Sequence, residues 1–326
     1  MAKARGPKPV DPLSEALSAM HMESSLLGIF NLAAPWAIVH PQLEGVVCHI
    51  VAEGTCCYNP DDGSSVELNK GDFIAFPYGD PHTLASGPGL KGMPIAPLLS
   101  AIGHPLWTPQ KQYLRPVRYW GDGLGARATV IDLISAFPDP RRNPLLRALP
   151  RVIHIRAENL QVLSWLDFLL AMVASEASTS TPGYAAAVSR IADLIFIQAV
   201  RTYLDIHAGE ARGWLRGLLH PRISRALQAI HHAPEKNWTV AQLAAEAGMS
   251  RTPFAREFLE CLEQTPIHYL TEWRMHLALR RLAQGVPVSI VSDELGYASP
   301  ISFARTFRRV VGTTPGTFRR SAATPA

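Results

Sequence analysis

The last third of this sequence contains an internal repeat. The segment VAQLAAEAG at 240–248 aligns with VSIVSDELG at 288–296 at an offset of 48 residues, and after one inserted residue the match continues at an offset of 49. The identical pairs after the insertion are Ser250/Ser299, Phe254/Phe303, Ala255/Ala304, Arg256/Arg305, Phe258/Phe307, Thr265/Thr314 and Pro266/Pro315. A repeat of this kind predicts two copies of one supersecondary unit.

The first copy is predicted to be a helix, a turn and a second helix. Thr239 is a favourable N-cap, and apolar residues follow Val240 at helical spacing. Gly248 stands where the end of a helix favours a left-handed residue. On the second helix Phe254 and Phe258 are four residues apart and therefore share one face.

The second copy repeats this pattern. Ser299 is the expected N-cap, and Pro300 occupies the first helical position, where its missing N–H carries no cost. A third run of apolar residues predicts a helix over 266–283 that joins the two copies, with Gly285 and Pro287 ending it. The last third is therefore expected to be entirely helical.

Positive charge is concentrated in the same region. The 326-residue chain has a formal net charge of +4. Residues 222–326 hold 13 Lys and Arg against 8 Asp and Glu, whereas the remainder holds 18 against 19. This asymmetry predicts a polyanionic partner for the last third alone, and an incidentally basic tail is the alternative.

Residues 220–321 resemble the DNA-binding domain of the AraC/XylS family of transcription regulators. The second copy, GYASPISFARTFRRVVGTTPGTFR, matches the family signature nearly residue for residue, and WTVAQLAAEAGMSRTPFAREFLECLEQTPIHYLTEWR in the first copy also matches. The resemblance implies helix-turn-helix units at 239–259 and 288–310. Their second helices would enter successive major-groove segments on one side of double-stranded DNA.

The resemblance and the helical spacing indicate which side chains face DNA. Arg256 and Arg305 occupy matched positions where the family usually places base contacts, and arginine binds guanine O6 and N7. Thr252 and Ser302 are expected to be weaker base contacts. Arginines expected to bind phosphate, which sets register without discriminating bases, are Arg251, Arg274, Arg308 and Arg309. The alternative is pairing of these arginines with Glu257, Glu260 or Glu272. Ala255 stands at a position where the family has a large polar residue. This difference argues against strong base recognition by the first helix-turn-helix unit.

Residues 25–157 have a different sequence pattern, with short apolar runs separated by Gly, Pro and Asp. The stretches at 46–58, 64–84 and 128–137 predict strands of an antiparallel β fold. The spacing of the second cupin motif is present in Gly71, Pro77, Gly79 and His82, with Ser86 in place of the usual Asn. The first motif is partial. The segment therefore resembles the cupin-like jelly-roll barrel that serves as sensor in many AraC-type regulators.

Three residues match usual cupin ligand positions: His49, Glu53 and His82. His49 and Glu53 are four residues apart and hence on one face of a strand. Imidazole with carboxylate would suit Zn, Fe, Ni or Mn. Val47 replaces the fourth ligand, a histidine, and this argues against a metal, so no cofactor is expected. An organic effector in the interior and buried structural histidines are the other interpretations.

The four cysteines do not predict a disulfide framework. Cys56 and Cys57 are adjacent in a strand and point to opposite faces, whereas Cys48 and Cys56 could meet only across a suitable hairpin. No cluster of basic residues surrounds them in the sequence, so we expect small buried apolar residues, Cys261 included, rather than redox sensors.

Two further helical patterns occupy about 158–177 and 185–207. The region 158–219 is expected either to dimerise the sensor or to cap the β domain. Residues 1–24 are expected to be an N-terminal extension. No signal peptide is recognisable, and the longest apolar run is too short to span a bilayer, so a soluble cytoplasmic protein is expected.

Together these features predict an α+β chain with a cupin-like sensor domain, following helices and an all-α double helix-turn-helix domain. The expected function is a sequence-specific transcription regulator that responds to a small-molecule or chemical signal. RNA polymerase would be a further partner of an activator, and a homodimer is an open alternative. The rival functions are a metal-dependent cupin enzyme fused to a DNA-binding module and a constitutive architectural DNA binder.

Overall fold

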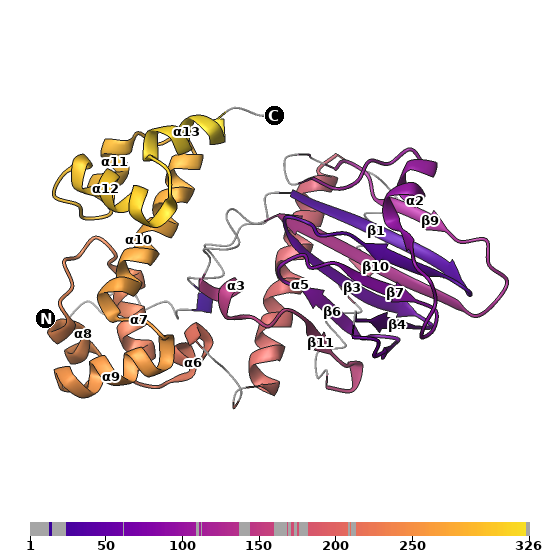
Figure 1. Ribbon diagram of the computed structural model, residues 1–326, viewed down its shortest axis with the longest axis horizontal. Coiled ribbons are helices and arrows are strands. Elements are labelled where there is room, and N and C mark those ends of the chain that lie inside the picture. The colour runs from indigo at the N-terminus through magenta and orange to yellow at the C-terminus, as the bar shows by residue number, and fades with distance from the viewer. Residues whose placement is uncertain are drawn as a thin grey trace, which may run out of the picture. The chain divides into compact units, whose positions relative to one another are not determined.

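The computed structural model of the chain contains a β-rich unit and a helical unit (Figure 1). The β-rich unit comprises His21–Pro140 and Leu149–Ile206, and the helical unit comprises Arg141–Ala148 and His207–Ala326 together with residues 1–20. The structure describes residues 13–14, 24–60, 62–108, 111, 113–136, 144–159, 168, 171–172, 175, 182–207, 209 and 213–323. Each unit is described by itself below.

Two sheets form the β-rich unit. The six-stranded sheet has the order β11 (Ile153–Ile155), β6 (Phe73–Phe76), β3 (Val46–Glu53), β10 (Arg127–Ala136), β1 (Ser24–Ala33) and β9 (Val117–Trp120). The five-stranded sheet has the order β5 (Val66–Asn69), β4 (Thr55–Asn59), β7 (His82–Ala85), β2 (Ala37–His40) and β8 (Met93–Pro94). Apart from β1–β9 and β2–β8, which are parallel, the pairs are antiparallel.

The two sheets face each other across one apolar core. Alternate residues of the large sheet, such as Leu26, Phe30 and Val130, share this core with Ile38 and Leu84 of the small sheet. Alternation follows from the two-residue period of a strand. The described strands form two separate sheets, so the predicted cupin-like jelly-roll fold is a sandwich and not a closed barrel.

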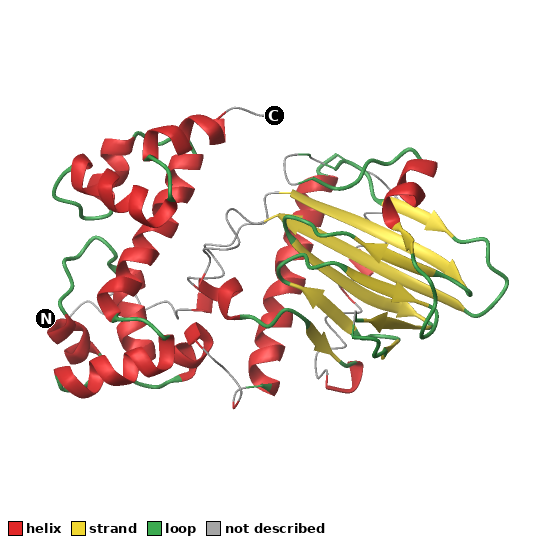
Figure 2. Cartoon of the chain, viewed as in Figure 1, coloured by secondary structure: helices red, strands yellow, loops and turns green. Residues whose placement is uncertain are grey.

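The outer face of the six-stranded sheet is also buried. Ile50 and Leu133, which point away from the sandwich core, are each at most 2% exposed. The long helix α5 (Tyr184–Ile206) packs against β1, β10 and β11 and covers this face (Figure 2). Burial on both faces explains why β3 and β10 are nearly continuous apolar runs. The shorter α2 (Ile95–Ala101) and the 3₁₀ turn η2 (Ala157–Asn159) complete the described elements of this unit.

The helical unit is an assembly of short helices around one long helix. Its elements are α3 (Pro144–Ala148), α6 (Gly213–Leu219), α7 (Ile223–His232), α8 (Val240–Glu246), α9 (Arg251–Leu262), α10 (Pro266–Ala283), α11 (Val288–Glu294), α12 (Pro300–Val311) and α13 (Pro315–Ala323). Helix α10 occupies the predicted range and connects the pair α8–α9 to the pair α11–α12 (Figure 1).

Local signals set the ends of these helices. Thr239 forms a capping box with Gln242 at the start of α8, and the Ser299 hydroxyl accepts from the amide of Ser302 at the start of α12. Ser250 occupies the N-cap of α9 without a side-chain cap bond. In the turns, Gly248 and Gly296 have φ of +65° and +72°, the left-handed region that favours glycine. The two predicted helix-turn-helix units are therefore confirmed.

The region 158–219 is divided between the two units. Helix α5 packs on the sheet and α6 lies in the helical unit against α9. The first predicted helix, 158–177, and the predicted N-terminal extension, 1–24, fall largely outside the described residues. Dimerisation through this region stays a prediction. None of the helices in the described part of the chain combines the length and hydropathy needed to span a bilayer.

Candidate functional sites

The second helix of each repeat has one buried face and one exposed face. Phe254 and Phe258 of α9 and Phe303 and Phe307 of α12 are each 0% exposed, and within each pair the ring centroids are 5.5 Å and 5.7 Å apart. These rings anchor the two helices in equivalent positions in their bundles. The opposite faces are left for a partner.

Arginine dominates the exposed faces. The exposed residues include Arg251, Thr252 and Arg256 on α9 and Arg305, Arg308 and Arg309 on α12. An open hollow of about 600 Å³ lies on the second helix-turn-helix copy. It is lined by Ala304, Arg305, Arg308, Arg309 and Thr314. A concave surface bordered by guanidinium groups has the charge and donors that a DNA backbone requires.

Two predicted contact residues have local partners. Arg256 lies 3.8 Å from Glu260 one turn later, and both side chains are more than half exposed, so the pair adds little stability and can open for DNA. The Ser302 hydroxyl donates to the carbonyl oxygen of Ser299 at 2.8 Å and is half-buried. Because the hydroxyl has only one hydrogen and that hydrogen is already donated, Ser302 can only accept a hydrogen bond from DNA.

Arg274 does not have the surroundings of a phosphate contact. It is 9% exposed, its guanidinium donates to the carbonyl oxygens of Pro234 and Lys236, and it lies over the Tyr297 ring at 5.4 Å. Burial lowers the pKa of this guanidinium. The prediction for Arg274 is therefore corrected, because its donors join the loop before α8 to the turn after α11.

Inside the β-sandwich, three histidines meet. His40 on β2 pairs directly with His82 on β7, and their rings stack with centroids 4.7 Å apart. His49 on β3 crosses from the other sheet, and its Nε2 lies 2.7 Å from His82 Nε2. Asp132, opposite His49 on β10, has Oδ1 2.6 Å from His49 Nδ1. Gly28 lies beside Asp132 in register, and a Cβ at Gly28 would lie 2.7 Å from the Phe30 ring and 3.3 Å from the Asp132 Cβ.

Burial opposes charge on every member of this cluster. His40, His49, His82 and Asp132 are 1–6% exposed. Burial lowers the pKa of His40 and His82 well below 6.5, and that of His49 to about 3. It raises the pKa of Asp132 to about 7. The cluster therefore favours a state with no net charge.

Glu53 is not part of this cluster, contrary to the sequence expectation. The register of β3 on β10 shifts between Val51 and Glu53, as at a β-bulge, and Glu53 is exposed. One extra residue in a strand reverses the alternation of its side chains, so His49 and Glu53 no longer share a face. Val47, in the position of the missing motif histidine, is fully buried in the apolar core.

Sequence reasoning missed His40 and Asp132. His40 lies outside both cupin motifs, and only the pairing of β2 with β7 brings it to His82. Asp132 carried a detectable signal, because it is an acidic residue in the middle of the apolar run ATVIDLISA. An unpaired carboxylate at an inward strand position would be costly, and this alone predicts a buried partner.

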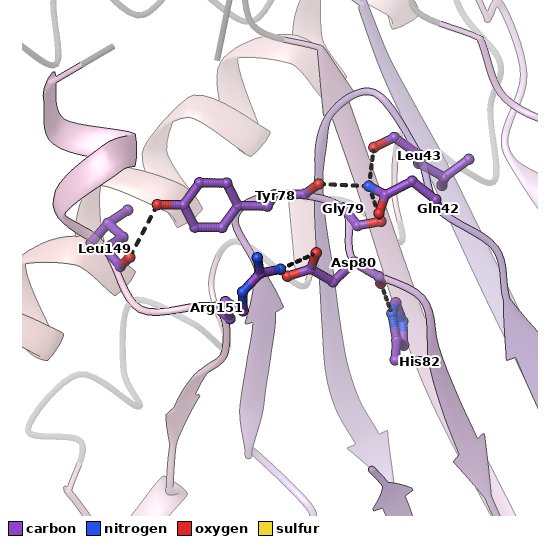
Figure 3. Close-up of polar contacts among 8 residues, drawn as sticks. All are labelled: Gln42, Leu43, Tyr78, Gly79, Asp80, His82, Leu149 and Arg151. Carbon is purple, nitrogen blue, oxygen red and sulfur yellow. Dashed lines mark hydrogen bonds and ion pairs between the residues drawn. The ribbon is translucent and has the colours of Figure 1, made fainter. Parts of the chain in front are cut away.

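The loop that carries His82 is fastened on two sides (Figure 3). Gln42 donates to the carbonyl oxygens of Leu43, Tyr78 and Gly79, and His82 Nδ1 lies 2.7 Å from the carbonyl oxygen of Asp80. Gly79 has φ +63°, and a Cβ there would collide with the carbonyl of Leu43, which explains the motif glycine.

The same loop is bonded to the residues that follow α3. The Tyr78 hydroxyl donates to the carbonyl oxygen of Leu149 at 3.4 Å, and Arg151 Nη1 donates to Asp80 Oδ1 at 2.8 Å (Figure 3). Ser86, in place of the motif Asn, exchanges hydrogen bonds with the backbone of Trp36. The described partners of Ser86 are thus structural.

A separate cleft opens at one end of the sandwich. It has a volume of about 380 Å³ and is lined mainly by apolar side chains of β1, β2, β8, β9 and α2, with Lys91 and Asp122 among its polar groups. Ile38, Leu98 and Tyr119 contribute to its wall. In contrast, the hollow next to His40 and Asp132 has about 20 Å³, room for a water molecule.

The cysteines lie apart. Cys48 and Cys56 belong to different sheets, and they are free and buried together with Cys261, whereas Cys57 is half-buried. Burial raises the pKa of all three buried thiols, that of Cys56 to about 12. The expectation of small buried residues is confirmed for these three.

Comparison with known proteins places these features in a family. Residues 11–205, more than half of the chain, match the family described as Cupin, and residues 243–321 match the family described as Helix-turn-helix domain. The chain belongs to the cupin family. With its helix-turn-helix domain it is an AraC-type transcription regulator.

Relatives along the chain carry the same function in their names. The chain is 27% identical to the HTH-type transcriptional regulator AlkR of Acinetobacter baylyi, over 95% of this chain and 99% of that protein. It is 33% identical to the RCS-specific HTH-type transcriptional activator RclR of Escherichia coli, over 53% of this chain and 62% of that protein. Among solved structures, ToxT of Vibrio cholerae with a bound unsaturated fatty acid is similar at 11% identity and a TM-score of 0.35. The match covers 91% of this chain and 95% of that chain.

Proposed function

We propose that this AraC-type regulator recognises two successive major-groove segments through α9 and α12, and that a ligand of its β unit sets its affinity for that site. The observation that carries the DNA part is the equivalent exposure of Arg256 and Arg305 on two copies of one unit. Each arginine projects from a helix whose other face is held by a buried phenylalanine pair. A rigid helix that presents arginine to the groove can discriminate bases.

The remaining exposed groups fit contacts to the DNA backbone. Arg308 and Arg309 are in the last turn of α12, and Arg251 begins α9. Their role as phosphate contacts is supported by their exposure at the edges of the two helices. Thr252 lies one residue into α9 and suits a base or a phosphate oxygen.

The apolar cleft of the β unit fits a small organic effector. Its volume of about 380 Å³ is within the range of ligand sites, and its lining is mainly apolar with few polar groups. A ligand there would act by binding one conformation more tightly than another, and this difference in affinity limits the change in DNA binding. Lys91 and Asp122 in this lining offer one group of each charge to the polar atoms of an effector.

The geometry favours a regulator over an enzyme. The histidine cluster lies inside the sandwich beside a hollow of about 20 Å³, too small for an organic substrate. Glu53, the carboxylate of the expected ligand set, is exposed and points elsewhere. A constitutive DNA binder would need neither the cleft nor the buried histidines.

Homodimerisation and contact with RNA polymerase are further parts of the proposal. A dimer would bind paired half-sites about 34–36 Å apart, or at a multiple of this distance. The exposed residues of α5, such as Leu194, are one candidate surface for a second copy.

Footprinting of the purified chain on DNA upstream of its own gene, across a salt series, tests the DNA part. We expect protection about two major-groove segments wide, and an affinity that falls steeply with salt because bound arginines release counterions. Two protected regions in register would indicate a dimer. Affinity no higher than for random DNA, with and without cell extract as a source of effector, would contradict the proposal.

A further inference from the structure

We propose that His40, His49 and His82 bind one divalent transition-metal cation of the Zn²⁺ class inside the β-sandwich. Asp132 and the backbone carbonyl of Asp80 would be the outer hydrogen-bond partners of the ligands. This set differs from the one that the cupin motifs imply, because His40 comes from neither motif and Glu53 and Val47 do not contribute.

The first support is convergence. One nitrogen from each of the three histidines lies within 4.8 Å of the other two, and the residues come from three different strands, β2, β3 and β7. The rings are held in place, since Phe76 and His40 both stack on the His82 ring, with centroids 3.7 Å and 4.7 Å from it. Three imidazoles fixed by packing form a preorganised donor set.

The second support is a count of hydrogens. Three short contacts run in series: Asp132 Oδ1 to His49 Nδ1, His49 Nε2 to His82 Nε2, and His82 Nδ1 to the Asp80 carbonyl oxygen. Each contact needs one hydrogen between its two atoms. A carboxylate and two neutral imidazoles supply only two hydrogens for three contacts. Without a cation, the third hydrogen must come from a protonated Asp132 or from a charged imidazole.

A metal between the two Nε2 atoms satisfies the network without that proton. Both imidazoles are then neutral, with Nδ1–H of His49 donating to Asp132 and Nδ1–H of His82 donating to Asp80. This is the usual arrangement of metal-bound histidine, in which the outer partner fixes the tautomer and the ring orientation. Ligand nitrogens about 2.0–2.1 Å from a tetrahedral Zn²⁺ lie about 3.3 Å apart. The rings of His49 and His82, now 2.7 Å apart at Nε2, must therefore separate slightly, and the His40 nitrogen, within 4.8 Å of the other two, must come closer.

The donor set selects the class of cation. Three imidazole nitrogens suit Zn²⁺, Cu²⁺, Ni²⁺, Co²⁺ or Fe²⁺, whereas Mg²⁺ and Ca²⁺ require oxygen ligands. Asp132 is the buried carboxylate beside the cluster and offsets part of the charge. Three protein ligands leave one coordination position for water or another small ligand. The adjacent hollow of about 20 Å³ has room for one water.

Metal content of the full-length chain tests the proposal directly. The chain is purified without a histidine tag, dialysed against Zn²⁺ and then against buffer, and analysed by mass spectrometry of the metal. We expect close to one Zn²⁺ per chain. His40→Gln, His49→Gln and His82→Gln should each weaken binding at least tenfold, whereas His104→Gln, in the same β unit outside the cluster, should bind as the wild type does.

Spectroscopy keeps the test independent of the folding of the variants. Co²⁺ bound by the wild-type chain should give the intense visible absorption of a tetrahedral site, and one equivalent of Zn²⁺ should remove it. Folded wild-type chain that takes up no metal, or a pale octahedral Co²⁺ spectrum, would overturn the proposal. Unchanged binding by all three variants would do the same.

Any effect of the cation on DNA rests on the proposed function, whereas binding of the cation does not. The footprint is therefore measured with and without Zn²⁺ on the same preparations. A chain that binds one Zn²⁺ but protects no DNA supports the metal site and contradicts the proposed function. A clear footprint from a chain that binds no metal supports the proposed function and contradicts the metal site.

Discussion

Arg274 and Arg305 are chemically identical, yet the structure gives them different surroundings. Arg274 is buried, with its donors bonded to two carbonyl oxygens, whereas Arg305 is exposed on α12. Helical spacing places both on predicted helices but does not say what lies opposite them. The roles of single residues therefore depend on whether a neighbouring segment covers them.

Arg305→Ala should weaken binding to the specific site by about 1–3 kcal/mol and relax the preference at one base position. The reason is loss of a bidentate contact to a base edge. Binding is measured by gel shift against the site and against single-base variants of it.

Arg308→Ala is the matched control on the same helix. As a phosphate contact, it should weaken binding to specific and random DNA alike and lower the salt slope by about 1. Equal losses of Arg305→Ala on specific and random DNA would show that Arg305 contacts phosphate instead.

His276 gives the helical unit a pH dependence. It is 3% exposed on α10, and burial lowers its pKa from 6.5 to about 4, with Arg280 and His231 as the neighbouring charged or titratable groups. Above pH 6.5 the imidazole is neutral in both states. Between pH 6.5 and 4 the unfolded chain binds a proton that the folded chain does not, so the free energy of unfolding should fall by on the order of 3 kcal/mol.

Urea unfolding, followed by tryptophan fluorescence at several pH values, measures this effect. His276→Gln should flatten the decline between pH 6.5 and 4, and His232→Gln, which replaces an exposed histidine, should leave it as in the wild type. The same slope in wild type and His276→Gln would mean that other groups cause the loss.

At the scale of elements, two turns hold the helix-turn-helix pair together. Gly296, in the turn after α11, faces the backbone of Glu235 in the loop before α8, and a Cβ at Gly296 would collide with that carbonyl. Arg274 on α10 bonds to the same loop and lies over Tyr297. The spacing of the two DNA-contacting helices thus depends on a close backbone approach.

Gly296→Ala should destabilise the helical unit by more than the ~1–2 kcal/mol cost of left-handed alanine, because the collision adds to the strain. It should also weaken specific DNA binding. Thermal unfolding and gel shift measure the two effects.

Gly312→Ala separates the two causes. Gly312 has φ +86° with open space around its Cα, so this variant carries the strain without the collision. If both variants lose the same stability and affinity, the approach of Glu235 has no role.

The apolar cleft permits a prediction for the β unit. Met93→Trp, at an exposed position of β8 in the cleft wall, should fill the cleft and weaken binding of 8-anilinonaphthalene-1-sulfonate by about tenfold. Leu114→Trp adds the same group at an exposed position outside the lining. Equal fluorescence titrations for the two variants would show that the probe binds elsewhere.

At the scale of the whole molecule, the chain passes between the β-rich unit and the helical unit at several points, and two of these passages lie in described residues near the histidine cluster or α5. One connection is α5 followed by α6. The other runs from the loop of Tyr78 and Asp80 to Leu149 and Arg151, which follow α3 directly. Helix α3 belongs to the helical unit, where it contacts α6 and where Arg147 pairs with Glu272 at 3.3 Å.

If the proposed Zn²⁺ site also affects DNA binding, Arg151→Ala should reduce that effect. The Arg151 side chain is 79% exposed, so its loss should leave Zn²⁺ binding and basal DNA affinity unchanged. The change in DNA affinity on addition of Zn²⁺ should fall about twofold to fivefold, because the Asp80 loop is then less firmly attached.

Arg156→Ala is the control, since Arg156 also pairs with a surface carboxylate, Glu158, at 3.7 Å. Gel shifts with and without Zn²⁺ compare the variants. Equal responses would exclude this route.

Much of the helical unit was predictable, because helices and their ends depend on residues close in sequence. The repeat, the phenylalanine pairs and the range of α10 followed from spacing alone. The β unit was predictable as strands and as a cupin-like fold from its second motif. Its histidine cluster was not, because strands far apart in the chain bring His40 to His82 and a β-bulge removes Glu53.

The sequence by itself determined the two helix-turn-helix units, the arginines on their outer faces and the apolar strands, since local periodicity and turn residues specify these. Only the tertiary structure decided that Arg274 is a structural residue, that α5 covers the outer face of a sheet, and that His40 and Asp132 complete the cluster. The physical reason is the same in each case. Long-range packing and strand register choose a side chain's neighbours, and those neighbours determine its chemistry.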